Sequence, residues 1–333
     1  MNECAVGIDV SKRKLDICVL RGRKAKTKVL PNDRAGHDAL HAWLMEQGLA
    51  SGTPVCLEAT GPYSEAVAVA LVDQGWTVSV INPARIKGFG QVQLSRNKTD
   101  RADARLLASF ACSVSLEPWH PPSLAVRDLR ALVERLQALQ DMRQQELNRL
   151  EVMAQVSTSP VAKMVQEHIA WLDRQINKIE RDINDHIDGH PELKQDAELI
   201  RSIPGIGDKT AARVLGYLGD VRRFKSAKAL AAFVGVTPRQ RLSGTSVRGR
   251  TMLSRTGHAD ARKALYMPGL VAVRHNPVIM AMAERLRTRG LAPKAIVGAS
   301  MRRLVHMIYG VVTSGTPFDA KIPLNGLAVQ DGI

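Results

Sequence analysis

Apolar and polar positions along the first third of this 333-residue chain fall mainly into the short runs that predict β-strands. Three such runs are joined by tight connections, after which helical spacing and apolar runs alternate. The expected strands are 4–10, 15–20, about 27–30, 55–59 and 76–81, with helices at 37–47 and 64–74. This order predicts an α/β domain in which a mixed sheet carries helices on its faces.

Longer helical patterns follow in the middle of the chain. A helix is expected at 98–113 with Thr99 as its N-cap, and the proline-rich segment 117–122 predicts a linker. Two long patterns come next, and apolar residues of the second, 165–183, recur at alternating spacings of four and three. With a turn-permitting segment at 157–160, this heptad seam predicts an antiparallel helical hairpin or coiled coil, self-contained or paired with another protomer.

The last third predicts further helices, beginning with a Pro-Gly-Ile-Gly turn and a helix that continues to residue 218. The turn resembles the helix-hairpin-helix motif, in which backbone amides and a helix N-terminus bind a DNA phosphate without reading its sequence. Gly205, Gly207 and Lys209 are then candidate nucleic-acid contacts, and a tight turn that merely needs glycine is the alternative. Other helices are expected at 227–233, 259–273, 278–289 and 293–310, the last with Arg302 and Arg303 exposed.

Charge is distributed unevenly over the expected parts. These parts are an α/β domain at 1–116, a linker and helical hairpin at 117–195, a mainly helical basic domain at 196–320 and a tail at 321–333. Of 47 Lys and Arg and 32 Asp and Glu, 22 and 6 lie from Arg201 onward, leaving 25 and 26 before it. The excess positive charge therefore predicts a polyanion partner for the C-terminal part. Nucleic acid is favoured over membrane because no basic amphipathic helix with an aromatic face is evident.

Cysteine usage and hydropathy indicate a cytoplasmic protein. The four cysteines, at positions 4, 18, 56 and 112, are widely spaced, which predicts reduced core residues rather than a zinc module or disulfides. No N-terminal signal precedes the first strand, and no apolar run is expected to approach the ~18 residues of a membrane span.

The stretch 239–250 combines hydroxyls, glycines and four guanidinium groups with no acid among them. Arginine presents a planar set of donors that matches phosphate oxygens, and glycine lets a ligand approach the backbone. The stretch predicts a phosphate site, and a solvated basic loop is the alternative. A hydroxyl in this setting can hold a phosphate or attack one. The candidate phosphate contacts are Arg239, Arg241, Arg248 and Arg250.

Four acids stand out by position: Asp9 within the first strand, Glu58 at the end of the fourth, and Asp100 with Asp103 in the first turn of a helix. An acid in an apolar strand is costly unless compensated, and carboxylates that converge on a metal pair provide compensation. Two hard cations about 4 Å apart would activate a nucleophile and stabilise the leaving oxygen of a phosphodiester. Each acid also has a simpler explanation as a turn cap, a strand-end salt bridge or a helix N-terminal acid.

Short motifs in both halves resemble one known family. In the N-terminal half they are Gly7-Ile8-Asp9-Val10-Ser11-Lys12, Glu58-Ala59-Thr60-Gly61, Ile81-Asn82-Pro83 and Asn97-Lys98-Thr99-Asp100-Arg101-Ala102-Asp103-Ala104. These resemble the N-terminal domain of the DEDD transposases of bacterial insertion sequences. The stretches 202–207 and 243–249 resemble the C-terminal domain of the same family.

The resemblance implies a RuvC-like domain of the RNase H superfamily, in which Asp9, Glu58, Asp100 and Asp103 bind Mg²⁺. It implies a second domain whose nucleophile is Ser243. It further implies recombination of donor and target DNA guided by a structured bridge RNA, with protomers in a tetramer, a dimer of dimers, that share composite active sites.

Two other functions remain open at this point. In a metal-dependent nuclease or Holliday-junction resolvase, the four acids activate water and Ser243 only binds phosphate. In a non-catalytic nucleic-acid-binding protein, the acids carry no activity. Residues alone predict the polyanion preference, while the choice of Ser243 over Ser246 as nucleophile comes from the resemblance.

Overall fold

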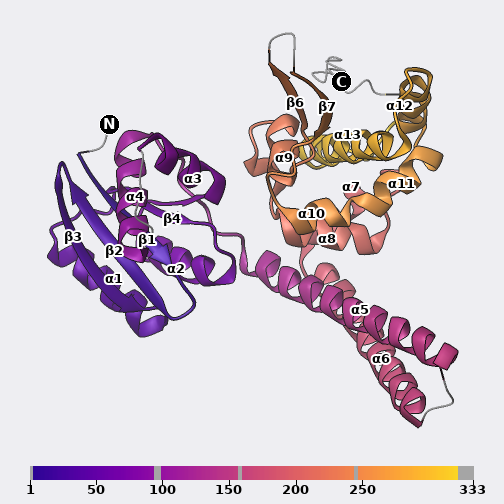
Figure 1. Cartoon of the computed structure of the whole chain (residues 1–333), viewed down its shortest axis with the longest axis horizontal. Helices are drawn as coiled ribbons and strands as arrows, with labels where there is room; N and C mark the ends of the chain where they lie inside the picture. Colours follow the sequence, from indigo (N-terminus) through magenta and orange to yellow (C-terminus); the bar gives the residue numbers. More distant parts are fainter. Residues whose placement is uncertain (1–2, 94–98, 157–159, 244–246, 322–333) are drawn as a thin grey trace. The chain divides into compact units, whose positions relative to one another are not determined.

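The computed structural model describes residues 3–93, 99–156, 160–243 and 247–321, and the expected tail therefore lies almost wholly outside the described residues. The chain forms two compact units, Met1–Pro121 and Pro122–Ile333 (Figure 1). The first is a mixed α/β unit and the second is mainly helical, which confirms the fold class predicted for the two halves.

A five-stranded sheet forms the centre of the first unit, in the order β3-β2-β1-β4-β5. The strands are β1 (Cys4–Val10), β2 (Lys14–Arg21), β3 (Lys24–Pro31), β4 (Val55–Glu58) and β5 (Val78–Ile81). The β1–β2 and β2–β3 pairs are antiparallel, whereas β1–β4 and β4–β5 are parallel. The predicted meander and mixed sheet are confirmed.

Helices cover both faces of this sheet. They are α1 (Arg34–Glu46), α2 (Pro62–Asp73), α3 (Pro83–Val92) and α4 (Asp100–Ser113). Because side chains alternate along a strand, β1 sends Val6 and Ile8 into a core with α1 and α2. Ala5, on the other face, packs in a cluster with side chains from α3 and α4. The acid positions of β1 and β4 share this second face with Ala5.

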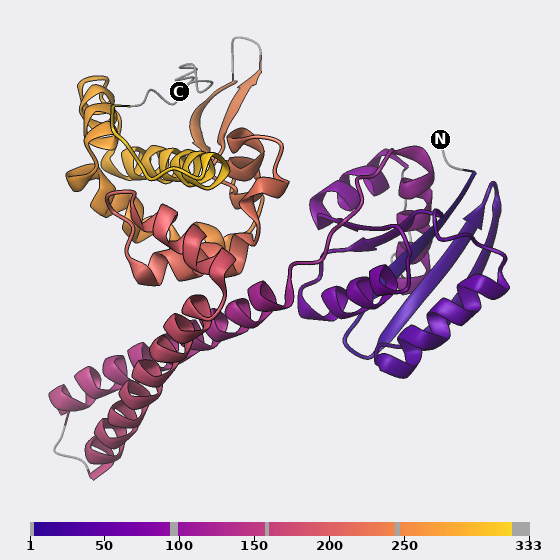
Figure 2. The ribbon, with the colours of Figure 1, turned by 180° about the vertical axis from the view of Figure 1, so that it is seen from behind.

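Two long helices open the second unit. They are α5 (Leu124–Val156) and α6 (Pro160–Asp188), which run side by side in Figures 1 and 2. Their seam is apolar: Leu129, Leu136 and Leu139 of α5 and Leu172 of α6 are almost fully buried in the core of this unit. The helical hairpin predicted from the heptad spacing is thus present.

Shorter helices complete the second unit around a central one, α13, whose Leu304 and Ile308 are fully buried. The elements are α7 (Pro191–Arg201), α8 (Asp208–Leu218), a 3₁₀ turn (Val221–Arg223), α9 (Ala227–Val234), α10 (Ala259–Ala264), α11 (Tyr266–His275), α12 (Pro277–Thr288) and α13 (Pro293–Ser314). An antiparallel hairpin lies between α9 and α10 and consists of β6 (Pro238–Ser243) and β7 (Val247–Leu253).

The structure corrects several expectations. The pattern at 259–273 is two helices, α10 and α11, because the chain turns at Leu265. Helix α3 was not predicted, since Asn82-Pro83 suggested only the end of a strand, whereas Asn82 caps the helix and Pro83 begins it. The basic stretch is a β-hairpin rather than a loop. Arg302 and Arg303 are partly buried, not exposed.

Among the described residues, α13 is long and apolar enough to cross a membrane, so the expectation that no segment approaches that length was wrong. Its residues are mostly buried within the second unit, and a core helix of this kind passes the same test of length and composition. All four cysteines are free, with Cys18 and Cys56 buried as expected.

Candidate metal centre and basic hairpin

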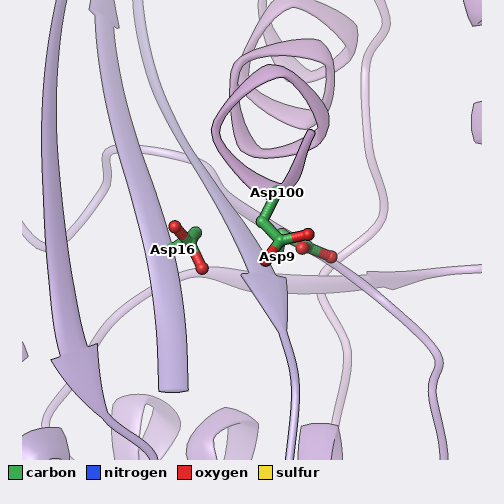
Figure 3. A group of neighbouring side chains, drawn as sticks. All are labelled: Asp9, Asp16 and Asp100. Atoms are coloured by element: carbon green, nitrogen blue, oxygen red, sulfur yellow. The ribbon is translucent and has the colours of Figure 1, made fainter. Parts of the chain in front are cut away.

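Three acids meet where β1 and β2 approach the start of α4. Asp9 lies near the end of β1, and the antiparallel register places Asp16 of β2 directly opposite it. Directly paired residues project from the same face of a sheet, so both side chains lie on the face covered by α4. Carboxylate oxygens of Asp9, Asp16 and Asp100 lie within 4.8 Å of one another (Figure 3).

The close approach of α4 to β1 depends on the absence of a side chain at Gly7. A Cβ at this position would overlap the carbonyl oxygen of Ala104 and the amide nitrogen of Ala108, both in the backbone of α4. The helix begins beside the strand because Thr99 caps it, its Oγ1 accepting a hydrogen bond from the amide of Ala102 at 3.2 Å. Asp100, the first residue of α4, is consequently held at the end of the sheet. The prediction that Thr99 caps this helix is confirmed.

The pKa of Asp9 reports the combined field of the cluster. Burial, as the largest cause, and then the charges of Asp103, Asp100, Asp16 and Glu58 together raise this pKa to about 6. The other three acids predicted from the sequence therefore all act on Asp9 in the folded protein. Glu58 contributes from the end of β4, the parallel neighbour of β1.

A lysine offsets part of this negative charge. The Nζ of Lys14 donates a hydrogen bond to Oδ2 of Asp100 at 2.6 Å and lies 3.0 Å from Oδ2 of Asp16. These hydrogen bonds raise the pKa of Lys14, and the same lysine lowers the pKa of Asp100. Lys14 and Asp16, which the sequence motifs did not single out, therefore contribute to the charge balance of the cluster.

Asp16 is the acid that sequence reasoning missed. Only 7% of its surface is exposed, although it is charged in the middle of a strand. The sequence does contain a signal for it. Asp16 is an acid in an apolar run that follows the strand of Asp9 after a tight turn, and a hairpin of this kind places it opposite Asp9. Its role depends on the register of β1 and β2, which pairs it with Asp9.

The donor set fits a divalent cation with a preference for oxygen ligands. Carboxylate oxygens that converge from separate elements are the ligands that Mg²⁺ and Ca²⁺ take in proteins. Burial and, after it, repulsion by the neighbouring acids raise the pKa of Asp9, and such an ion would offset both effects. Asp9, Asp100 and the nearby Asp16 supply oxygens close enough for one ion to bridge.

The basic stretch lies in the second unit. Ser243 is the last residue of β6 and pairs with Val247 of β7, and Arg241 pairs with Gly249. Arg248 and Arg250 lie on β7, and Arg239 is exposed on β6 opposite Met252. The structure describes the backbone of these strands but not the side chains of 240–251, and Ser246 lies outside the described residues.

The Pro-Gly-Ile-Gly turn joins α7 to α8, as predicted. Gly205 adopts φ +104°, a conformation that favours glycine, and a Cβ there would lie 3.0 Å from the Cβ of Ala272. Gly207 is the N-cap of α8. Lys209 forms an ion pair with Glu180 of α6 at 2.5 Å. The turn therefore has a clear packing role, whereas phosphate binding by these three residues stays a prediction.

Comparisons with known proteins agree with these observations. A family model described as a transposase, of the DEDD type, matches residues 6–156, and a second, described as the transposase IS116/IS110/IS902 family, matches residues 197–284. The pilin gene-inverting proteins of Moraxella lacunata and Moraxella bovis are each 30% identical over 97% of this chain and 99% of their own length. The transposase of insertion sequence element IS1111A from Coxiella burnetii is 25% identical over 54% of the chain and 57% of its length.

An acid cluster on an α/β sheet, followed by a basic helical unit, together with these matches defines a DNA transposase, an enzyme that cuts and rejoins DNA strands. The chain belongs to the IS116/IS110/IS902 family of transposases. DNA is therefore its substrate, and the DEDD type of its first domain suggests a divalent metal.

Proposed function

We propose that this transposase cuts and exchanges strands of donor and target DNA through a covalent link to Ser243, with Mg²⁺ held by a RuvC-like domain of the RNase H type. The observation that carries the proposal is the convergence of acids on Asp9, whose pKa is raised by all three other acids of the DEDD set. The strand order β3-β2-β1-β4-β5, with three antiparallel strands followed by parallel ones, supports the RNase H-like assignment.

In the proposed step, the Oγ of Ser243 forms a bond to a DNA phosphorus while the bond from phosphorus to the 3′ oxygen breaks. The serine proton passes to a carboxylate of the acid cluster, and the leaving 3′ oxygen takes up a proton. The product is a phosphoserine and a free 3′-hydroxyl, which attacks the exchanged strand later. Covalent catalysis of this kind conserves the phosphodiester for rejoining.

Residues of both units have roles in this scheme. Asp9, Glu58, Asp100 and Asp103 would hold Mg²⁺, which when bound would stabilise charge that develops on the phosphate oxygens. Arg241 precedes Ser243 by two residues on β6, and Arg248 follows Val247, the partner of Ser243 on β7. These two arginines are therefore the nearest candidates to neutralise the phosphoryl oxygens. The scheme requires both units to meet over one phosphate, within one protomer or between protomers.

The basic second unit also supports binding of a structured guide RNA. Its excess of Lys and Arg suits a polyanion. The choice of a bridge RNA as one such partner, beside the DNA, rests on the family resemblance. The long hairpin of α5 and α6 is the element we assign to assembly of a dimer of dimers. A relative named for inverting a pilin gene supports a site-specific recombinase, since inversion cuts and rejoins DNA. The protein would act on cytoplasmic DNA.

The decisive experiment is capture of the covalent intermediate. Wild-type protein incubated with Mg²⁺, its RNA and labelled donor DNA should give a protein–DNA adduct on a denaturing gel. Ser243→Ala should abolish the adduct and strand exchange, because no other group takes over the attack. Ser246→Ala, three residues further on, is the matched control and should retain both. An adduct that persists in Ser243→Ala would refute the assignment of the nucleophile.

A metal-dependent nuclease or junction resolvase is the second candidate, because the acid cluster gathers within the first unit without any contribution from Ser243. In that case the acids would activate water and Ser243 would only bind phosphate. Cleaved DNA without an adduct, at equal rates in wild type and Ser243→Ala, would favour it.

A further inference from the structure

The start of β2 is fixed by the turn that connects it to β1. The Oγ of Ser11 donates a hydrogen bond to the carbonyl of Lys14 at 2.9 Å and accepts one from the amide of Lys14 at 3.2 Å. The carbonyl of Ser11 in turn accepts a hydrogen bond from the side chain of Asn32 at 2.9 Å. The backbone amide and carbonyl of Lys14 are therefore both held by hydrogen bonds, and its long side chain can change conformation while the backbone stays in place.

That side chain joins two elements of the acid cluster. Its ammonium contacts Asp16 on its own strand and Asp100 at the start of α4. The Asp16 side chain is only 10% exposed, whereas that of Asp100 is 53% exposed. Burying a carboxylate is costly without a compensating charge, so Asp16 depends on Lys14 more than Asp100 does.

Asp16 and Asp100 are also the two acids whose carboxylate oxygens lie within 4.8 Å of each other and of an oxygen of Asp9. An ion that binds Asp9 and Asp100 would therefore approach a carboxylate whose Oδ2 the ammonium of Lys14 already contacts at 2.6 Å. A divalent ion and an ammonium cannot share this position, because like charges repel at such distances. One of them has to move, and Asp16 offers the lysine a second, more buried partner.

We propose that Lys14 is an internal counter-cation that occupies the acid cluster of the metal-free protein, and that a divalent ion binds by displacing it from Asp100, so that the lysine keeps only its contact with Asp16. Lys14 then sets the metal affinity of the cluster without touching the DNA. Asp16 is a positioning residue that retains the displaced lysine. This inference rests on the proposed metal role of the four acids, and it adds Lys14 as a cation that competes with the metal for Asp100.

Removing the competitor should tighten metal binding. In Lys14→Met, we expect Mg²⁺ to bind about fivefold more tightly than in wild type, the upper range for loss of one exposed ion pair. Lys14→Arg keeps the charge and should stay close to wild type. The matched control is Lys24→Met, which removes one lysine from β3 of the same sheet, at an exposed position. It should leave Mg²⁺ binding unchanged.

Isothermal titration of the DNA-free, full-length protein with Mg²⁺ measures these affinities, and thermal unfolding in EDTA confirms that each variant is folded. As a second readout, Mg²⁺ should raise the melting temperature more in Lys14→Met than in wild type, because the unpaired acids repel one another without metal. As a single substitution, Asp16→Asn should weaken Mg²⁺ binding, because the displaced lysine loses its partner. In the Lys14→Met background the same substitution should weaken binding less, because no lysine remains to be held.

The outcomes separate this inference from the proposed function. If Asp9→Asn binds Mg²⁺ as tightly as wild type does, the metal is not at the acid cluster and both ideas fail. If binding depends on Asp9 but Lys14→Met binds no more tightly than wild type, the counter-cation is refuted while the metal site stands. Equal tightening in Lys24→Met would also refute it, since net charge would then explain the effect.

Discussion

The acid cluster and the basic hairpin place charge in the protein in different ways. Asp9, Asp16 and Glu58 lie on a sheet whose other face is a buried core, and Asp100 and Asp103 lie on α4, which packs closely against β1 at Gly7. The basic residues lie on a two-stranded hairpin at the edge of a helical unit. Like charges that must stay close together need a rigid frame, whereas cations that grip a phosphate chain are stabilised by the ligand itself.

The largest effect that tests this comparison is loss of catalysis without loss of binding. Asp9→Asn removes a charged ligand from the centre of the cluster, so strand cleavage with Mg²⁺ should fall at least about 100-fold. DNA affinity should change little, because an acid gives no favourable phosphate contact.

Arg239→Ala is the contrasting variant on the basic hairpin. It should weaken binding at every sequence, lower the salt slope of log K by about 1, and retain cleavage at saturating protein. Gel-shift titrations at several salt concentrations and a cleavage assay measure both variants. Loss of cleavage in Arg239→Ala at saturation, or full activity in Asp9→Asn, would remove the proposed division of roles.

A structural effect of intermediate size is expected at Gly7. Gly7→Ala places a Cβ against the backbone of α4, so the helix must shift, and the free energy of unfolding should fall by about 2 kcal/mol. Because the shift moves Asp100 away from Asp9, Mg²⁺ binding should weaken as well. Urea unfolding and titration measure the two effects.

The matched control for this variant is Gly88→Ala, in α3 of the same unit, where a Cβ meets no atom within 4 Å. It should be neutral or slightly stabilising, because alanine favours a helix. Equal behaviour of the two variants would show that close packing of α4 does not build the cluster.

The smallest expected effect concerns pH. Asp9 titrates at about 6 in the folded protein, above the usual value for an aspartate of about 3.9. A raised folded pKa means that the contribution of Asp9 to stability is fully present below about pH 4 and is lost as the pH rises through 6. Asp9→Asn in EDTA should therefore be the more stable protein at pH 7.5, by about 1 kcal/mol after allowance for solvent screening.

Urea unfolding of both proteins at pH 4.5 and 7.5 checks this prediction. Asp73→Asn, which alters an exposed acid at the end of α2, is the control and should show no such change between the two pH values. A gap between Asp9→Asn and wild type that stays constant with pH would show that burial and the neighbouring acids do not raise the pKa of Asp9 in the folded state.

Much of the first unit was predictable, and its errors have physical causes. Alternating apolar runs marked all five strands, and Thr99 marked the start of α4. Asp16 was missed because its role depends on the register of β1 and β2, which pairs it with Asp9. Lys14 was missed because a lysine at the start of a strand is normally solvated, and only α4 brings Asp100 within its reach.

The second unit was predictable at the level of helices but less so at its basic stretch. Heptad spacing marked α5 and α6, since a seam of this length has no other stable partner than a second helix. Glycines and arginines in 239–250 obscured the period-two pattern, so the hairpin was taken for a loop. The choice of Ser243 rests on the family resemblance.

The sequence by itself determined which residue types are present and on which elements they lie: four acids on strands and a helix start, a heptad hairpin, and a basic C-terminal half. Local periodicity and capping are short-range properties, so they can be recognised without the fold. Tertiary structure decided what those acids do to one another. The raised pKa of Asp9, the buried partner Asp16 and the ammonium of Lys14 between two carboxylates follow from strand register and from the close approach that Gly7 permits, which are contacts between distant positions.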